Sequence, residues 1–146
     1  MAAGGEIGDQ LTTLVAVGAT ALLGFRAFRM LQANRCAIAP AELHHRMTGG
    51  EDLLVLDVRS AEEFHGKLGH VKGAVNLPIG ELPARLSALK EQFSNLRDTT
   101  VVITCLHGPR ASSGLAHMRK AGFRKLHVLK GGMAAWSTAG LPVHRK

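Results

Sequence analysis

The chain has 146 residues, of which 18 are Lys or Arg and 11 are Asp or Glu, for a formal net charge of +7 at pH 7. This length accommodates one domain and a short appendage. The two cysteines make no disulfide framework, the eight histidines lack the ligand spacing of a zinc site, and no nucleic-acid recognition motif accompanies the 4% of aromatic residues. We therefore expect a reducing compartment, no metal, no cofactor and no nucleic-acid partner.

The first 36 residues differ in character from the rest of the chain. Leu11 to Phe25 is an uncharged, mostly apolar run, LTTLVAVGATALLGF, preceded by acidic residues and followed by arginines. At about 1.5 Å per residue the run reaches roughly 22 Å, so a span of the bilayer core, about 30 Å thick, needs flanking residues and extends over about 8–30. The sequence predicts a tail and a single membrane-spanning helix in residues 1–36.

The arginines that follow this segment predict its orientation. Arg26, Arg29 and Arg35 lie on its C-terminal side, and positive residues prefer the cytoplasmic side of a membrane. A cleaved signal peptide is disfavoured because the basic n-region is missing, and an interfacial helix because the apolar run has no polar face. We expect a single-pass membrane protein whose second domain, residues 37–146, faces the cytoplasm, where its excess of basic residues favours anionic lipids and anionic donors.

The second domain reads as alternating strands and helices, a pattern typical of a parallel α/β sheet. Strand-like runs occur at Leu53 to Val58, Val101 to Cys105 and Leu126 to Leu129. Ser60 and Glu63 have the spacing of a capping box that opens a short helix before Gly66. An apolar stripe at helical spacing predicts a further helix with one buried face, and its members are Leu82, Leu86, Leu89 and Phe93.

The run CLHGPRA, from Cys105 to Ala111, joins a β-branched strand to a helical segment that ends at Gly122. This placement puts the thiol at a helix N-terminus, where backbone N–H groups and the helix dipole stabilise a thiolate, a persulfide or a bound oxyanion. Most cysteines are simply small buried residues. A core cysteine does not need the bend at Gly108 and Pro109 or the charge of Arg110, so the context favours a catalytic nucleophile.

Three segments, in order, resemble the rhodanese, or sulfurtransferase, family over about residues 38–143. They are LLVLDVRSAEEFHGKLGHVKGAVNLPIGEL, VVITCLHGPRASSGLAHMRKAGF and VLKGGMAAWSTAGLPV. The resemblance implies an α/β fold with a parallel sheet flanked by helices on both faces. It also implies that Cys105 takes a sulfane sulfur as a persulfide and that the following loop binds the substrate, with the residues Leu106, His107, Gly108, Pro109, Arg110 and Ala111.

The length and composition of this loop refine the expected activity. Related tyrosine phosphatases place five residues between the cysteine and the arginine, whereas four separate Cys105 from Arg110 here, which favours a sulfur-sized adduct over a phosphoryl group. Members that favour thiosulfate often have basic residues after the cysteine, where this chain has Leu106 and His107. Ala111 replaces a serine of many members. Phosphatase activity is thus the weaker hypothesis, and the loop does not identify the sulfur donor.

Outside the loop, the resemblance is more structural than chemical. Asp57 and Arg59 follow a predicted core strand, at the sheet edge where ligands bind, so they either support the site or form an ordinary ion pair. His70 and Asn76 belong to a segment whose polar side chains usually fix loops, and Trp136 is expected to be a packing anchor.

The sequence therefore predicts a sulfurtransferase that moves sulfur from thiosulfate or a related small anionic donor to cyanide, a thiol or a protein acceptor through a persulfide on Cys105. The alternative is a non-catalytic rhodanese-like module that binds protein partners at the membrane. Retention of the loop cysteine favours the enzyme. The sequence assigns no role to Cys36.

Overall fold

The computed structural model describes residues 20–25 and 36–146. The chain divides into two compact units, Met1–Arg35 and Cys36–Lys146. In the first unit, the described residues 20–25 are helical. Within the described part of the chain, no helix is long and apolar enough to cross a membrane. Most of the segment predicted to span the membrane, about 8–30, lies outside the described residues, so that expectation stays a prediction.

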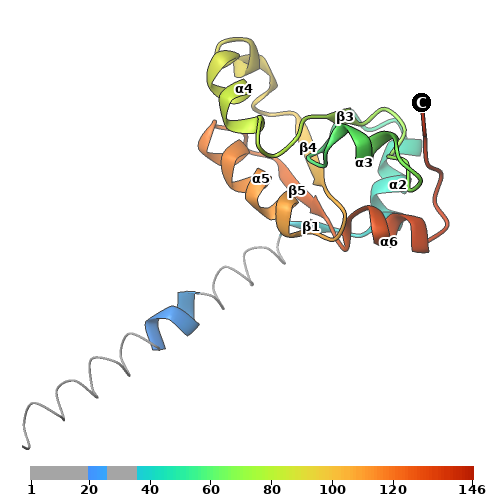
Figure 1. Ribbon diagram of the computed structural model, residues 1–146. Helices are drawn as coiled ribbons and strands as arrows, with labels where there is room; N and C mark the ends of the chain where they lie inside the picture. Colours follow the sequence, from blue (N-terminus) through green and yellow to red (C-terminus); the bar gives the residue numbers. More distant parts are fainter. Residues whose placement is uncertain (1–19, 26–35) are drawn as a thin grey trace, which may run out of the picture. The chain divides into compact units, whose positions relative to one another are not determined.

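The second unit is built on a five-stranded sheet in which every pair of neighbouring strands is parallel (Figure 1). The strands, in spatial order, are β1 (Ala37–Ile38), β5 (Leu126–Leu129), β4 (Thr100–Thr104), β2 (Leu53–Asp57) and β3 (Val75–Asn76). The three predicted strands are confirmed as the centre of the sheet. The two edge strands have only two residues each, too few to show an apolar pattern in the sequence.

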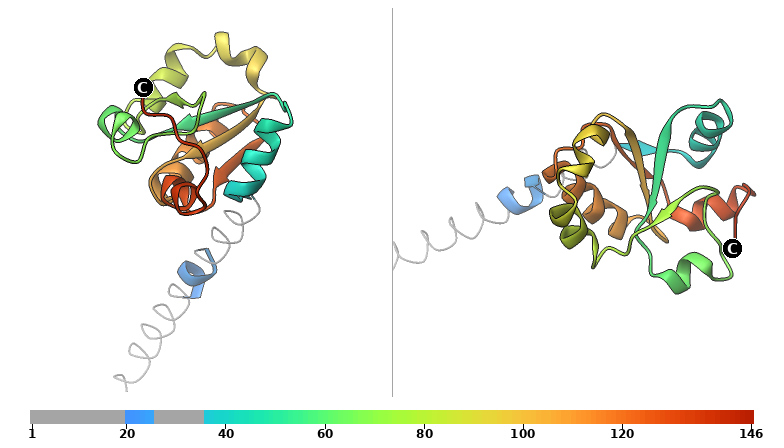
Figure 2. Two further views of the ribbon diagram at one scale, coloured as in Figure 1. Left: turned by 90° about the vertical axis from the view of Figure 1, so that its right-hand side faces the viewer. Right: turned by 90° about the horizontal axis from the view of Figure 1, so that it is seen from above.

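Helices cover both faces of this sheet, as the family resemblance implies (Figure 2). Side chains of α4 (Leu82–Ala88) and α5 (Pro109–Lys120) pack against one face, and those of α2 (Pro40–Thr48) and α6 (Gly132–Thr138) pack against the other. A short helix, α3 (Ala61–His65), follows β2. The observed fold is therefore the predicted parallel α/β arrangement.

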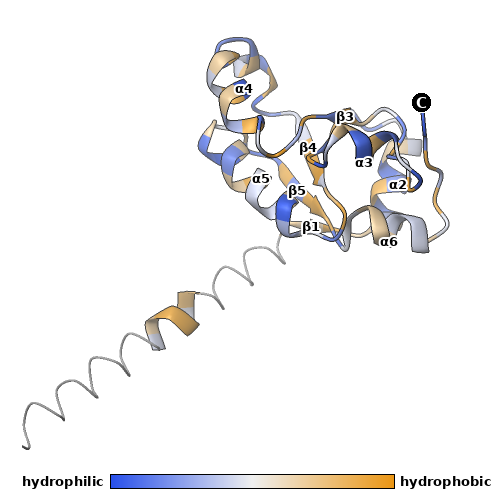
Figure 3. Ribbon diagram, in the orientation of Figure 1, coloured by the Kyte–Doolittle hydropathy of each residue, from blue (hydrophilic) through white to orange (hydrophobic). Residues whose placement is uncertain are grey.

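The central strands are apolar on both faces because both faces are covered. Val101 and Ile103 enter the core beneath α4 and α5, whereas Val102 enters the core beneath α2 and α6. Figure 3 shows the resulting run of hydrophobic residues along β4 and β5. Trp136 is the largest fully buried side chain, and its indole N–H donates to the carbonyl of Pro142 at 2.9 Å. Its expected role as a packing anchor is confirmed.

The helix predicted from the apolar stripe is shorter than the stripe. Leu82 and Leu86 are buried on α4, which ends at Ala88, while Phe93 lies in a separate 3₁₀ helix, η1 (Gln92–Leu96). Phe93 still packs against the same core. The stripe therefore marks one buried face, and two helical segments share it.

Candidate active site

Cys105 directly follows β4 and lies four residues before the start of α5. It thus sits at the carboxyl edge of a central parallel strand, where α/β folds bind their ligands. The residue is 1% exposed. At Gly108 the chain turns into α5 with a φ of +134°, a backbone conformation that residues other than glycine rarely adopt. The predicted loop between strand and helix is therefore in place.

The thiol of Cys105 faces the beginning of α5. The backbone N–H of Gly108 donates to Sγ at 3.0 Å. No side chain caps the helix, and its first residue, Pro109, has no N–H. The N–H groups of the first turn have no acceptor within a helix, and the dipole is positive at this end, so the surroundings of Sγ favour negative charge. A thiolate or persulfide sulfur is the species that fits them.

The loop residues predicted to bind substrate surround this position to different degrees. His107 and Pro109 are exposed, Leu106, Gly108 and Arg110 are half-buried, and Ala111 is fully buried against the core. Ala111 therefore acts from within the core as a packing residue. The other five are at least partly exposed to solvent.

The N-terminus of α6 is hydrogen-bonded to the backbone of the Cys105 loop. The sequence did not predict this contact. The N–H of Met133 donates to the carbonyl of Cys105 at 2.8 Å, and that of Ala134 donates to the carbonyl of Leu106 at 3.0 Å. Gly132, with φ of +60°, comes so close that an added Cβ would collide with both carbonyl oxygens. The Gly131–Gly132 pair was the sequence signal for this close approach.

Arg110 extends from the first turn of α5 to α3. Its Nη1 and Nη2 donate to the two carboxylate oxygens of Glu63 at 2.6 and 2.8 Å. Glu63 also accepts from the N–H of Ser60 at 3.2 Å and completes the predicted capping box, which is confirmed. The sequence showed Glu63 only as a capping residue, because the 47 positions that separate it from Arg110 hide the pair.

This ion pair changes how both groups titrate. The pKa of Glu63 falls from 4.5 to about 2, chiefly because Arg110 donates to its carboxylate, although partial burial acts the other way. The pKa of Arg110 is raised, chiefly by the same hydrogen bonds and in smaller part by negative charge at Cys105 and Asp57. Arg110 therefore stays charged, and Glu63 stays ionised at every pH at which the fold is expected to work.

Asp57 and Arg59 form a second, fully buried pair. The side chains are 0% and 1% exposed, and Arg59 Nη2 lies 2.6 Å from Asp57 Oδ2. Arg59 also donates to the carbonyls of Glu63 and Gly69, at 3.2 and 2.8 Å. Asp57 and Arg59 therefore form an ion pair, one of the two roles expected for them, and this pair fixes α3 and the following loop.

His70 and Asn76 extend this support. His70 stacks on Phe64 with ring centroids 3.6 Å apart, and its Nδ1 lies 2.9 Å from the Phe64 carbonyl. Its backbone exchanges two hydrogen bonds with His144, which ties the C-terminal segment to this loop. Asn76 Nδ2 donates to the carbonyls of Asp57 and Arg59 at 3.0 and 2.9 Å. Both residues fix loops, as expected.

Cys36 does not join the site. It precedes β1, two strands away from β4, and its Sγ lies 3.6 Å from Nη2 of Arg119, near the end of α5 opposite to Cys105. About ten helical residues, or about 15 Å, separate the two ends. Both cysteines are free thiols.

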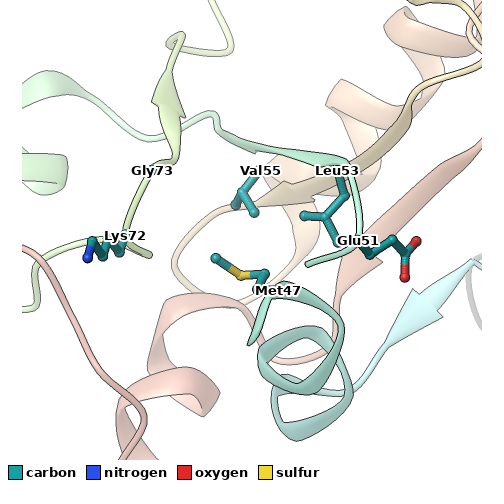
Figure 4. A pocket seen from close by; sticks show the side chains of 6 residues that line it. All are labelled: Met47, Glu51, Leu53, Val55, Lys72 and Gly73. Atoms are coloured by element: carbon teal, nitrogen blue, oxygen red, sulfur yellow. The ribbon is translucent and has the colours of Figure 1, made fainter. Parts of the chain in front are cut away.

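A pocket of about 210 Å³ lies elsewhere, between α2 and the start of β2 (Figure 4). Its lining comprises Met47, Glu51, Leu53, Val55, Lys72 and Gly73, and none of the loop residues that follow Cys105 belongs to it. Among residues 20–25 and 36–146, no three His, Cys, Asp or Glu side chains gather in a way that could hold a metal ion. The pocket and the Cys105 loop are therefore separate features of the domain.

Residues 39–139, more than half of the chain, match the rhodanese-like domain family. The chain belongs to this family. A sulfurtransferase of Allochromatium vinosum is 32% identical over 69% of this chain and 87% of that protein. An HTH-type transcriptional regulator of Mycobacterium tuberculosis is 36% identical over 94% of this chain, which spans only 54% of that longer protein.

Solved structures agree on the fold. The rhodanese-like domain of an Anabaena protein superposes with a TM-score of 0.64 at 28% identity, over 75% of this chain and 78% of that one. The α/β rhodanese fold is therefore shown, and the sulfurtransferase relative supports a general role in sulfur transfer.

The buried pair predicts a large loss of stability when one partner is neutralised. Asp57→Asn leaves Arg59 charged and buried, so we expect the free energy of unfolding to fall by about 3–5 kcal/mol in urea titrations. Asp98→Asn is the matched control, because it removes the same charge from a pair with Arg124 whose side chains are 66% and 70% exposed. That variant should lose less than about 1 kcal/mol. Equal losses in the two variants would contradict the proposed role of burial.

The Arg110–Glu63 pair predicts a pH-dependent contribution to stability. Because the pKa of Glu63 is lowered, from 4.5 to about 2, its contribution is complete above pH 4.5 and is lost as the pH falls through 2. Glu63→Gln should therefore reduce the free energy of unfolding by ~1 kcal/mol at pH 7, a value that allows for partial exposure. The difference from the parent should shrink between pH 5 and 2. Urea unfolding at several pH values measures it, and a difference that is constant with pH would refute the assignment.

Proposed function

We propose that the protein is a sulfurtransferase that carries a sulfane sulfur as a persulfide on Cys105. The observation that carries the proposal is the thiol at an uncapped helix N-terminus, with the Gly108 N–H directed at Sγ. The family match and the sulfurtransferase relative support it. The donor is thiosulfate or a related sulfane-sulfur compound, and the acceptor is cyanide in vitro or a thiol or protein in the cell.

The proposed reaction has two half-reactions. In the first, the Cys105 thiolate attacks the sulfane sulfur, a new S–S bond forms, and the donor leaves with the electron pair of the broken bond. The persulfide then lies in a loop whose N–H groups favour its negative charge, and the burial of Cys105 limits the access of water to it. In the second, the acceptor takes the outer sulfur and the Cys105 thiolate returns.

Intact-mass analysis of the full-length protein tests the proposal. After incubation with thiosulfate or with a hydropersulfide, we expect the parent to gain one sulfur atom that cyanide removes. Cys105→Ser should gain none and should keep its fold by circular dichroism. Cys36→Ser is the matched control, because it removes the other free thiol, and it should load like the parent. A parent that gains no sulfur from either donor would favour the alternative, a non-catalytic module that binds protein partners.

We further propose that the apolar segment from Leu11 to Phe25 tethers this enzyme to a membrane, with the rhodanese domain in the cytoplasm. The arginines after the segment and the basic composition of the domain support this orientation.

Fractionation of bacterial cells that express the full chain tests the tether. The protein should stay in the membrane fraction through high-salt and alkaline washes, dissolve in detergent, and resist protease added outside spheroplasts. Deletion of residues 11–25 should move it to the soluble fraction. Salt release of the full chain would instead indicate surface adsorption, and digestion of the domain in intact spheroplasts would reverse the orientation.

A further inference from the structure

Arg59 lies after the carboxyl end of β2, and Arg110 lies in the loop that follows Cys105. Each of these arginines forms an ion pair with a carboxylate. The guanidinium of Arg59 is buried against Asp57. That of Arg110 meets both carboxylate oxygens of Glu63 in a two-bond pair, with 38% and 34% of the two side chains exposed. Such a pair fixes the plane of the guanidinium and takes up two of its donors. A donor that reaches the loop therefore meets an arginine whose charge is largely compensated.

The rest of the loop offers little fixed positive charge. Leu106 is apolar, and His107, the one other ionisable side chain between Cys105 and Ala111, is exposed. Sulfane-sulfur donors differ most in charge. Thiosulfate carries two negative charges, whereas a hydropersulfide of a small thiol carries at most one. A site with a compensated arginine therefore gives thiosulfate less attraction than a site with a free one.

We propose that Glu63 determines donor choice: by holding Arg110, it disfavours dianionic thiosulfate and favours the persulfides of small or protein thiols. The inference rests on the proposed sulfurtransferase function. Glu63 is a positioning residue that acts through Arg110, because nothing in the structure places it in contact with Cys105. Its carboxylate is held on α3 by the capping box, so the compensating charge is a fixed part of the site.

Both loading reactions balance without any oxidant or reductant. With a hydropersulfide, the Cys105 thiolate bonds to the outer sulfur, the S–S bond of the donor breaks, the small thiolate leaves, and the proton remains on the transferred sulfur. With thiosulfate, the S–S bond breaks in the same way and sulfite leaves with two charges. The difference between the two reactions is the charge that must approach and leave beside Arg110.

The test measures single-turnover sulfur loading of the full-length protein by intact mass, with thiosulfate and with the hydropersulfide of 2-mercaptoethanol. The parent should load faster from the hydropersulfide at equal concentration. Glu63→Gln frees the charge of Arg110 while keeping a residue that serves in a capping box. We expect the ratio of the thiosulfate rate to the hydropersulfide rate to rise about tenfold in this variant.

Two further variants separate a charge effect from a structural one. Glu62→Gln is the matched control, because it removes the same charge from the preceding residue of α3, which is exposed and makes no ion pair with Arg110. Its donor ratio should stay within about twofold of the parent, since exposed charges are well screened. Adding Arg110→Gln to Glu63→Gln should abolish the gain for thiosulfate. The gain should also shrink as ionic strength rises.

The outcomes are distinct. A rise in the ratio that requires Arg110 and is absent in Glu62→Gln would support the inference. An unchanged ratio in Glu63→Gln, or a rise that persists without Arg110, would overturn it while the persulfide on Cys105 still stands. If no variant and no parent protein gains sulfur from either donor, the proposed function itself fails.

Discussion

The hydrogen bonds between the start of α6 and the carbonyls of Cys105 and Leu106 are the constraint on which the site depends. They fix the backbone on one side of the thiol, while α5 begins on the other side. Only a glycine at position 132 allows this approach, because any side chain would collide with the same carbonyls. With the loop backbone held in this way, the Gly108 N–H can be directed at Sγ.

The two ion pairs next to the loop have different physical roles because they differ in burial. The Asp57–Arg59 pair is buried from solvent, and either charge without its partner would destabilise the fold. The pair therefore fixes the positions of β2, α3 and the Gly69 carbonyl relative to one another. The Arg110–Glu63 pair is partly exposed to solvent, and Arg110 belongs to the loop that follows the thiol. Its contribution to stability is modest, and the carboxylate compensates much of the charge of Arg110.

Much of this fold follows from local patterns in the sequence. The β-branched strands, the capping box at Ser60 and the loop after β4 all show periodicity or turn chemistry within a few residues, and all are present in the structure. What the sequence did not reveal depends on distant partners. The contact of Arg110 with Glu63 and the bonds from α6 to the loop join segments that meet only once the sheet has formed. The two-residue edge strands are too short to show alternation.

The position of α6 also has a consequence for how the protein is made. Its loop-bracing residues, Met133 and Ala134, follow Cys105 in the chain and so leave the ribosome after it, just as His144 leaves after His70, with whose backbone it pairs. The sheet strands and Cys105 emerge earlier, so a nascent chain exposes a thiol on a loop that lacks its bracing. The loop therefore gains its bracing only once α6 has emerged, and until then the thiol of Cys105 is more open to oxidation.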